Sequence, residues 1–391
     1  MKKVLLGTTA LLGAGIVASP AFAADGIKLS VGGFFKEAYM VNFDDDSEGE
    51  AGNENNTDGF FNDAEIHFKG STVLDNGLEV GARVELEGEN DGDQIDEAWV
   101  SFSGGFGEVH IGSEDDALAN GCIVPPGGTG NFSAFSPNQW GANTVTSGHA
   151  GNLLSSNTVC AGVDDRGDAQ KILYVSPSFS GFQVALSYTP NGADQNHTDQ
   201  VGPHVGMPDN ADGESRHNFS VYATYSYEGD GWGLTWGGGG SWEGHVEQAV
   251  GPDNDEQDFY QTGLNLTFGN FSVGGVFEYF NDAAVNGVIS NNAGIDTDAW
   301  VAGGGISYSM DPYTVGFQYS HGDFDIDNPG TDNSDANIDR FALTGNYALG
   351  PGIAVDAELA YTTQDASGPD FDEGQDNYDA FEIGIGTNIT F

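Results

Sequence analysis

Residues 76–88, NGLEVGARVELEG, decide the fold of this chain. Apolar and mostly charged residues alternate along them: Leu78, Val80, Ala82, Val84 and Leu86 against Glu79, Gly81, Arg83, Glu85 and Glu87. A period of two predicts a β-strand with one apolar face and one charged face. In a soluble sandwich the apolar face packs on a core, whereas in a transmembrane barrel it meets lipid and the charged face lines water. The remainder of the chain has to distinguish these two folds.

The first twenty-three residues have the form of a secretory signal peptide. Met1, Lys2 and Lys3 are followed by an apolar stretch over 4–17, and residues 21–23, Ala-Phe-Ala, form a small-x-small cleavage signal. The short length of the stretch and its glycines argue against an N-terminal membrane helix. We therefore expect an exported mature chain of residues 24–391.

The composition is strongly acidic, with 60 Asp and Glu against 10 Lys and Arg and a formal net charge of −50. Such a polyanion is not expected to bind nucleic acid unaided, and it favours cations as partners. Aromatic residues make up 12% of the chain and glycines number 60, which is typical of strands and turns rather than of disorder. Because no apolar run after residue 23 has the length of a membrane helix, the mature chain could enter a membrane only as a barrel.

Alternation and turn residues predict sixteen strands, and the connections between them alternate in length. The predicted strands are 27–43, 60–70, 76–88, 94–103, 106–112, 169–176, 181–190, 217–228, 231–243, 258–268, 270–281, 297–309, 313–321, 338–348, 352–363 and 378–391. A long acidic stretch, 44–59, follows the first strand, and only a short turn follows the second. Long loops on one side and short turns on the other are typical of an even-stranded membrane barrel.

The basic residues support this interpretation. Six of them lie on the strand face opposite the apolar one: Lys28, Lys36, Lys69, Arg83, Lys171 and Arg340. Arg166 and Arg216 lie in predicted loops. None falls on a lipid-facing position, where a basic residue costs about 2–4 kcal/mol near the bilayer midplane. Glu37 is an exception, because it shares the face of Phe35 and Tyr39; either a bulge shifts the register there or this face meets a neighbouring subunit.

Aromatic residues gather near the strand ends: Tyr39, Phe43, Tyr188, Tyr227, Trp300, Tyr308, Tyr361 and Phe391. Ordinary β-propensity explains each of them singly. Aromatic girdles at the two membrane–water boundaries also explain why they gather at the ends.

Four segments in order carry a family resemblance: 63–88, 93–117, 172–188 and the closing IGIGTNITF of 383–391. With them the chain resembles the trimeric, sixteen-stranded general porins of Gram-negative bacteria, in their alphaproteobacterial version. The resemblance implies an all-β antiparallel barrel in the outer membrane, assembled as a homotrimer and passing small hydrophilic solutes by diffusion. It also implies a third loop folded into each pore, and a terminal Phe391 read by the barrel-assembly machinery. No cofactor is implied.

The predicted third loop, 113–168, offers an acidic rim for the pore. It opens with Glu114, Asp115 and Asp116 and ends near Asp164, Asp165 and Asp168. The predicted barrel wall supplies pore-lining residues: Lys36, Lys69, Arg83, Glu79, Glu85, His67, His110, Lys171 and Arg340. Facing rims of charge set ion preference, with pairs at ~8 Å contributing ~1–2 kcal/mol in a watery neck. We expect cations to be favoured; the alternative is that the loop carboxylates are merely solvated.

Both cysteines, Cys122 and Cys160, lie within this predicted loop. Because exported compartments are oxidising, we predict a disulfide between them; two free thiols are the alternative. General porins of the resembled type usually lack cysteine, so the path of this loop does not follow from the resemblance.

Asp323, Asp325 and Asp327 are spaced as in a calcium loop, although the stretch 323–328 lacks the glycine and the closing glutamate of an EF-hand. Weak Ca²⁺ binding, or bridging to anionic lipopolysaccharide through divalent ions, is one hypothesis. A hydrated, self-repelling acidic loop is the other.

The sequence contains no HExxH, GxSxG or CxxC motif, and neither His67 nor His110 has the partners of a catalytic triad. We therefore predict a water-filled, cation-favouring outer-membrane channel and no enzyme. One alternative is a substrate-selective channel in which the disulfide-held loop is the filter. A secreted or surface β-protein, such as an adhesin, is the other.

Overall fold

The computed structural model describes residues 26–44, 57–88, 95–135, 159–160, 169–192, 214–247, 256–281, 296–327, 332–368 and 377–391. The predicted signal peptide lies outside them. The strands are β1 (Lys28–Asp44), β2 (Asp58–Val73), β3 (Glu79–Glu87), β4 (Ala98–Gly104), β5 (Gly107–Ser113), β6 (Gln170–Val175), β7 (Phe182–Asn191), β8 (Glu214–Gly229), β9 (Trp232–Trp242), β10 (His245–Glu247), β11 (Asp258–Phe268), β12 (Phe271–Asn281), β13 (Asp296–Met310), β14 (Tyr313–Asp327), β15 (Ser334–Gly350), β16 (Ile353–Ser367) and β17 (Asn377–Thr390), and the short helix is α1 (Ala117–Gly121). None of the described helical residues form a span long and apolar enough to cross a membrane.

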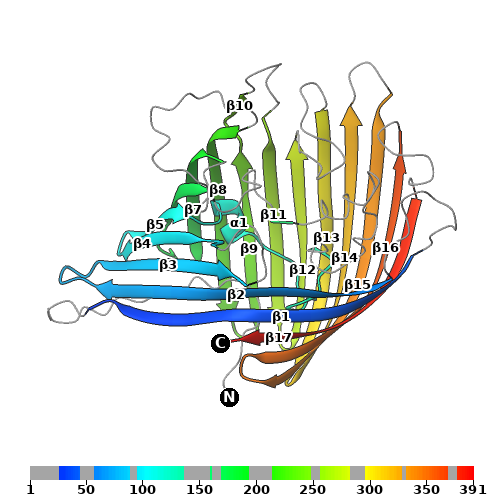
Figure 1. Cartoon of the computed structure of the whole chain (residues 1–391), viewed down its shortest axis with the longest axis horizontal. Helices are drawn as coiled ribbons and strands as arrows, with labels where there is room; N and C mark the ends of the chain where they lie inside the picture. The colour runs from blue at the N-terminus through cyan, green and yellow to red at the C-terminus, as the bar shows by residue number, and fades with distance from the viewer. Residues whose placement is uncertain are drawn as a thin grey trace.

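The strands close into an antiparallel barrel (Figure 1). Each strand pairs with its neighbour along the chain, and β1 closes the circle by pairing with both β2 and β17. The three residues of β10 continue β9 and pair with the same neighbour, β8, so sixteen strands stand around the barrel. The sixteen-stranded, all-β prediction is confirmed.

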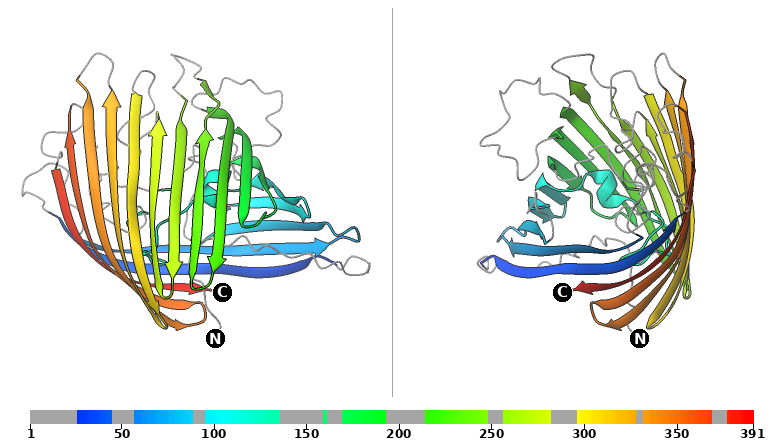
Figure 2. Two further views of the ribbon diagram at one scale, coloured as in Figure 1. Left: turned by 180° about the vertical axis from the view of Figure 1, so that it is seen from behind. Right: turned by 45° about the vertical axis from the view of Figure 1, so that its right-hand side comes forward.

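Several strands extend further than the sequence predicts. β14 runs to Asp327 instead of ending at 321, because its alternation continues beyond the apolar belt with Phe324 and Ile326 pointing inward. β15 and β16 also extend beyond their predicted bounds at this end, so the barrel wall is higher along these strands (Figure 2). The sequence prediction stopped where the outward residues turned from apolar to acidic.

The outer face of the barrel is apolar across its middle. Val315, Phe317 and Leu343 are 53%, 43% and 46% exposed there. Above this belt, tyrosine hydroxyls on one strand donate to aspartates on the next: Tyr279 to Asp298 at 2.7 Å, Tyr361 to Asp379 at 3.0 Å and Tyr319 to Asp339 at 2.5 Å. Amphipathic rings with their polar ends toward acidic side chains are typical of a membrane–water boundary. The apolar residues of 76–88 accordingly face outward, as in a membrane barrel.

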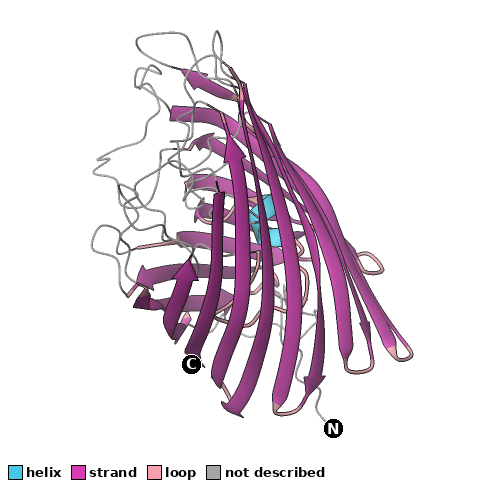
Figure 3. Cartoon of the chain, turned by 90° about the vertical axis from the view of Figure 1, so that its right-hand side faces the viewer, coloured by secondary structure: helices cyan, strands magenta, loops and turns pink. Residues whose placement is uncertain are grey.

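The core of the molecule lies inside the barrel, between its wall and the connection that follows β5. This connection carries α1, which lies within the ring of strands (Figure 3). Its apolar side chains Leu118, Phe135 and Val159 belong to one buried cluster with wall residues such as Tyr222 and Val301. Burial of apolar surface therefore holds this inner loop against the strands.

Candidate functional site: the channel lumen and its inner loop

The inner loop begins with α1, which is fixed to three strands. The Asp116 carboxylate caps the helix, accepting from the backbone N–H groups of Leu118 and Ala119 at 2.8 Å each. Three wall serines complete the anchor: Ser241 donates to Asp116 Oδ2 at 2.8 Å, Ser187 accepts from Ala117 N at 3.0 Å, and Ser220 accepts from Leu118 N at 2.9 Å. Hydroxyls from β7, β8 and β9 thus form hydrogen bonds with the backbone N–H groups and the capping carboxylate at the start of α1.

Beyond α1 the loop runs along the inner wall from β11 to β16. Four polar wall side chains donate to its backbone carbonyls: Gln261 to Ile123 O, Asn265 to Val124 O, Gln318 to Pro125 O and Ser320 to Ala134 O, at 2.9 Å each. Asp356 of the wall accepts from the Asn131 side-chain amide of the loop at 2.8 Å. Apart from the half-buried Asn265, these wall groups lie at buried positions, where unpaired polar groups would be costly. The wall is therefore built to receive this loop.

Inward-facing glycines let the loop lie directly against the strands. A Cβ added at Gly263 would lie 2.7 Å from Ile123 Cβ, one at Gly303 would lie 2.9 Å from the Phe135 ring, and one at Gly384 would lie 2.6 Å from the Phe132 ring. None of these contacts follows from the sequence, because a glycine in a strand indicates the close approach of another group but does not identify that group.

The predicted disulfide is present between Cys122 and Cys160, which lie 38 residues apart with 5.7 Å between their Cα atoms. It joins the end of α1 to the returning part of the loop. There the Cys160 N–H donates to Glu278 Oε2 on β12 at 2.9 Å. The bridge therefore ties two wall-bound segments of the loop together.

The acids that open the loop have three different surroundings. Glu114 is 4% exposed and lies 2.6 Å from His110 Nδ1, while Asp116 is 3% exposed and caps α1. Asp115 stays partly exposed, and its N–H donates to Glu97 Oε1 at 3.4 Å. Burial, reinforced by the Glu97 charge, raises the pKa of Asp115 to about 7. Asp164, Asp165 and Asp168 lie outside the described residues.

Glu97 belongs to the same acidic group, although it was not among the pore residues predicted from the sequence. Burial, then the charge of Glu114, raises the pKa of Glu97, while the nearby Arg83 guanidinium lowers it. Glu97 lies just before β4, at the same end of the barrel as the top of β5, so the strand register brings it to Asp115. Glu97 falls inside the predicted strand 94–103, where its place in the sequence alone did not indicate this contact.

Most cations of the wall lie beside carboxylates or under the loop. Lys36 Nζ is 2.7 Å from Asp63, and the Arg83 guanidinium pairs with Glu85. Lys171 is 3% exposed, and its ammonium donates to the Glu114 carbonyl. Of the predicted wall residues, Lys69 is exposed and Glu79 is partly exposed.

Arg340 also points inward, but it is only 1% exposed. Its guanidinium lies 2.6 Å from Glu358, pairs with Glu382 and donates to Thr362 at 2.9 Å. This buried cation, held by two carboxylates and a hydroxyl, links neighbouring strands within the wall and has little contact with the water in the pore.

Aromatic rings join the charged wall of β3 to β5. The Trp99 and His110 rings stack with centroids 4.0 Å apart, and the Arg83 guanidinium lies 5.9 Å from the Trp99 ring. His110 also lies 2.9 Å from Glu108. A cation over an aromatic face is stabilised electrostatically, so this row holds Arg83 in place.

The family model described as Gram-negative porin matches residues 7–367. This chain belongs to the Gram-negative porin family. The monosaccharide porin of a Halomonas species is 24% identical over 424 aligned residues, which cover 100% of this chain and 92% of that protein. The solved structure of OmpT from Vibrio cholerae in its trimer form has a TM-score of 0.57 and 12% identity, covering 94% of this chain and all of that one. The anion-selective porin of Comamonas acidovorans has a TM-score of 0.53 and 16% identity, covering 93% and 100%.

As a porin, the chain is an outer-membrane channel for passive diffusion and not an enzyme. The barrel gives the path, and the described part of the loop lies inside it along the wall. The two solved barrels above share the fold, and one of them is an anion-selective porin.

The structure places Asp323, Asp325 and Asp327 on the outer face of the porin's β14 and not in a loop. Asp325 lies directly opposite Asp298 on β13 and Asp335 on β15. The predicted loop is therefore wrong at this point, because strand alternation continues through the acids. Ca²⁺ binding by these residues stays a prediction.

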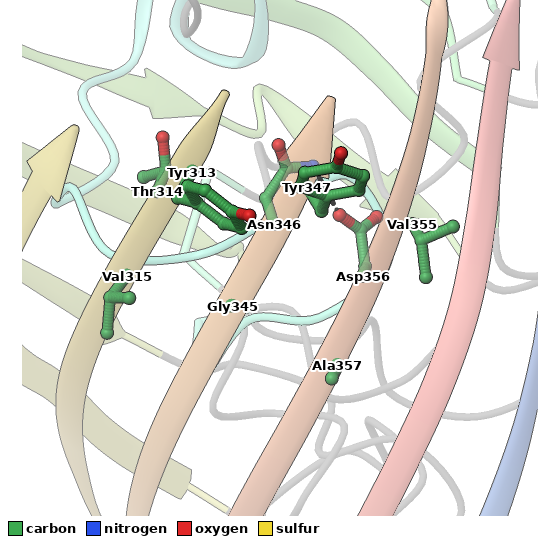
Figure 4. A pocket seen from close by; sticks show the side chains of 9 residues that line it. All are labelled: Tyr313, Thr314, Val315, Gly345, Asn346, Tyr347, Val355, Asp356 and Ala357. Carbon is green, nitrogen blue, oxygen red and sulfur yellow. Dashed lines mark hydrogen bonds between the residues drawn. The ribbon is translucent and has the colours of Figure 1, made fainter. Parts of the chain in front are cut away.

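A groove on the outer surface of the porin lies over Gly345, between Tyr313, Tyr347 and Val355 (Figure 4). A Cβ at Gly345 would meet nothing within 4 Å. The groove faces away from the lumen, so it is no part of the solute path. Gly345 therefore provides a control for the inward-facing glycines, because a side chain added there would point away from the inner loop.

Proposed function

We propose that this porin passes small hydrophilic solutes with a preference for cations. The observation that supports the preference is the state of the wall charges. Lys36 and Arg83 lie against carboxylates, and Lys171 is covered. Meanwhile Asp115 and Glu97 form an acidic group where the loop enters the lumen. Fixed carboxylates at a narrowing attract cations and repel anions.

The size of the solute is part of this proposal. Hydrogen bonds from β7 to β16 and the Cys122–Cys160 bridge support a loop of fixed shape, which would select solutes mainly by size. The relative named a monosaccharide porin suggests sugars of that size as solutes for this chain too. A substrate-selective channel, with the bridged loop as its filter, is the second candidate. We retain the alphaproteobacterial version of the fold as a proposal from the four quoted segments.

We also propose a homotrimer with its interface at the seam of β17, β1 and β2. Thr387, Glu37 and Asn62 lie side by side there on the outer face, in register and without a bulge. A row of polar groups facing lipid would be costly, whereas a neighbouring subunit could receive it. Lipopolysaccharide at the acidic outer rim and the barrel-assembly machinery at Phe391 are further proposed partners.

Planar-bilayer recording of the refolded mature protein tests the function. We expect stepwise insertion in triplets and, across a KCl gradient, a reversal potential showing K⁺ preference. Anion preference would contradict the charge argument and leave the porin intact. Competition between a monosaccharide and the ion current would favour the substrate-selective channel.

A further inference from the structure

We propose that Glu65, His67 and Glu85 form a lumenal binding site for a divalent first-row transition-metal ion such as Zn²⁺. Glu65 and His67 lie two residues apart on β2, so both point inward. Glu85 lies on β3 directly opposite His67 in the strand register. Two neighbouring strands thus present three potential ligands to the same water-filled space.

The distances suit a single ion. His67 Nε2 lies 2.7 Å from Glu65 Oε2 and 3.1 Å from Glu85 Oε2, and one donor atom from each residue lies within 4.8 Å of the others. Ligand atoms about 2.0–2.2 Å from Zn²⁺ lie roughly 3.3–3.6 Å apart in a tetrahedron. The three side chains therefore need only small rotations to surround an ion, and water can supply the fourth position.

The chemistry of the donors selects the kind of ion. Ca²⁺ and Mg²⁺ take oxygen ligands, whereas an imidazole together with carboxylates suits the later first-row divalent ions. Glu65 also belongs to a second, all-oxygen group with Glu87 and Asp96, whose ligand atoms again lie within 4.8 Å of one another. That group would draw hydrated cations to the site, but only the first group offers a nitrogen.

Neighbouring side chains hold the ligands in place. Glu85 is 3% exposed; its Oε1 is paired with the Arg83 guanidinium but accepts no hydrogen bond within the described residues, and its Oε2 faces His67. The Phe34 ring packs edge-on against the His67 ring, at 6.0 Å and 87°. Groups that orient ligands in this way raise metal affinity. Glu65 and His67 remain half-buried, so an ion can reach them from the lumen.

Direct titration of the detergent-solubilised, folded porin with CoCl₂ tests the site, because Co²⁺ reports its coordination by visible absorption. We expect saturation at one Co²⁺ per chain, displacement by Zn²⁺, and no displacement by Ca²⁺ at equal concentration. Glu79→Gln is the matched control: it removes an inward carboxylate from the same strand β3 outside both groups, and it should leave binding unchanged.

His67→Gln and, separately, Glu85→Gln should each weaken Co²⁺ binding at least tenfold while the barrel keeps its heat-modifiable mobility on gels. Binding in both variants equal to that of the native chain would overturn the proposal, as would displacement by Ca²⁺ as effective as by Zn²⁺. The inference is independent of ion preference. A channel that conducts ions but does not bind Co²⁺ would contradict only the proposed metal site. A folded barrel that binds Co²⁺ but does not conduct ions would contradict only the proposed function.

Discussion

Glu114, Asp115 and Asp116 are adjacent in sequence, but the fold gives each carboxylate a different environment. Glu114 contacts His110, and Asp116 is occupied by the helix cap. Asp115 is partly exposed beside Glu97. We therefore expect the charge that a passing ion meets at the start of the loop to depend most on Asp115.

Asp115→Asn should reduce K⁺ preference without disturbing the loop, because the change is isosteric and leaves the α1 cap intact. One charge at ~8 Å in a neck of intermediate dielectric contributes about 1 kcal/mol, or roughly fivefold in the permeability ratio. Reversal potentials across a KCl gradient measure it. Asp116→Ala should act differently, lowering loop stability by about 1 kcal/mol through the lost cap. Unchanged reversal potentials in Asp115→Asn would remove Asp115 from the selectivity rim.

The same residue predicts a pH dependence. Because burial and Glu97 raise the pKa of Asp115 to about 7, the carboxyl gains a proton as the pH falls through neutrality. Protonation removes negative charge, so K⁺ preference should decline between pH 8 and pH 6. Because the same carboxyl titrates near pH 3.8 in the unfolded chain, its raised pKa lowers folding stability progressively as the pH rises from about 4 to about 7, and the loss is complete above that. Asp115→Asn should flatten the selectivity profile, and an equally steep profile in that variant would assign the titration to another group.

At the scale of elements, the inner loop depends on the small residues of the wall. Gly263 leaves the space that Ile123 fills, and Gln261 on the same strand bonds the Ile123 carbonyl. The loop therefore packs against β11 where Gly263 has no side chain, and the Gln261 amide bonds it at the same place.

Gly263→Val should displace the loop toward the open lumen, since its Cβ would lie 2.7 Å from Ile123 Cβ. We expect lower single-channel conductance and a loss of about 1–3 kcal/mol from overpacking. Gly345→Val is the matched control, because its Cβ meets nothing within 4 Å on the outer face. Conductance should be unaltered there. Equal effects of both variants would mean that any valine in these strands disturbs the barrel.

The bridge between Cys122 and Cys160 is the second determinant of the loop's shape. On the chain-entropy model, closing its 38-residue separation contributes up to about 4 kcal/mol to holding the loop. Cys122→Ser with Cys160→Ser should keep the barrel folded and increase current noise. Reductant should do the same to the native chain and nothing to the double variant. Quiet, unchanged currents in the double variant would show that the wall hydrogen bonds alone fix the loop.

For the molecule as a whole, the sequence predicted what depends on regular alternation and missed what depends on contacts. Strand β11 appears with its predicted bounds, and the lipid-facing side of β3 follows from period-two alternation alone. The same alternation continues through the acidic stretch at Asp323, but the sequence did not reveal it, because polar outward residues do not distinguish a long strand from a loop. Glu97 and Gly263 gain their roles from segments distant in the chain, which no local pattern encodes.

The polar seam of β17, β1 and β2 is the subunit interface that we propose. Glu37 lies on the outer face between Phe35 and Tyr39, with Asn62 and Thr387 beside it on the neighbouring strands. If this seam packs against another subunit, Glu37→Leu removes a polar contact from the interface. If the seam faces lipid, the same change replaces a costly carboxylate with a favourable side chain.

We therefore expect Glu37→Leu to lower the temperature at which trimers dissociate, measured by electrophoresis of unboiled samples over a heating series. Glu37→Gln, which keeps hydrogen bonding, should retain most of the native value. Leu343→Ile on β15 controls for altered lipid contacts, because Leu343 lies on the outer face away from the seam. A barrel that stays monomeric and becomes more heat-resistant with Glu37→Leu would place this seam in lipid and end the case for a trimer contact there.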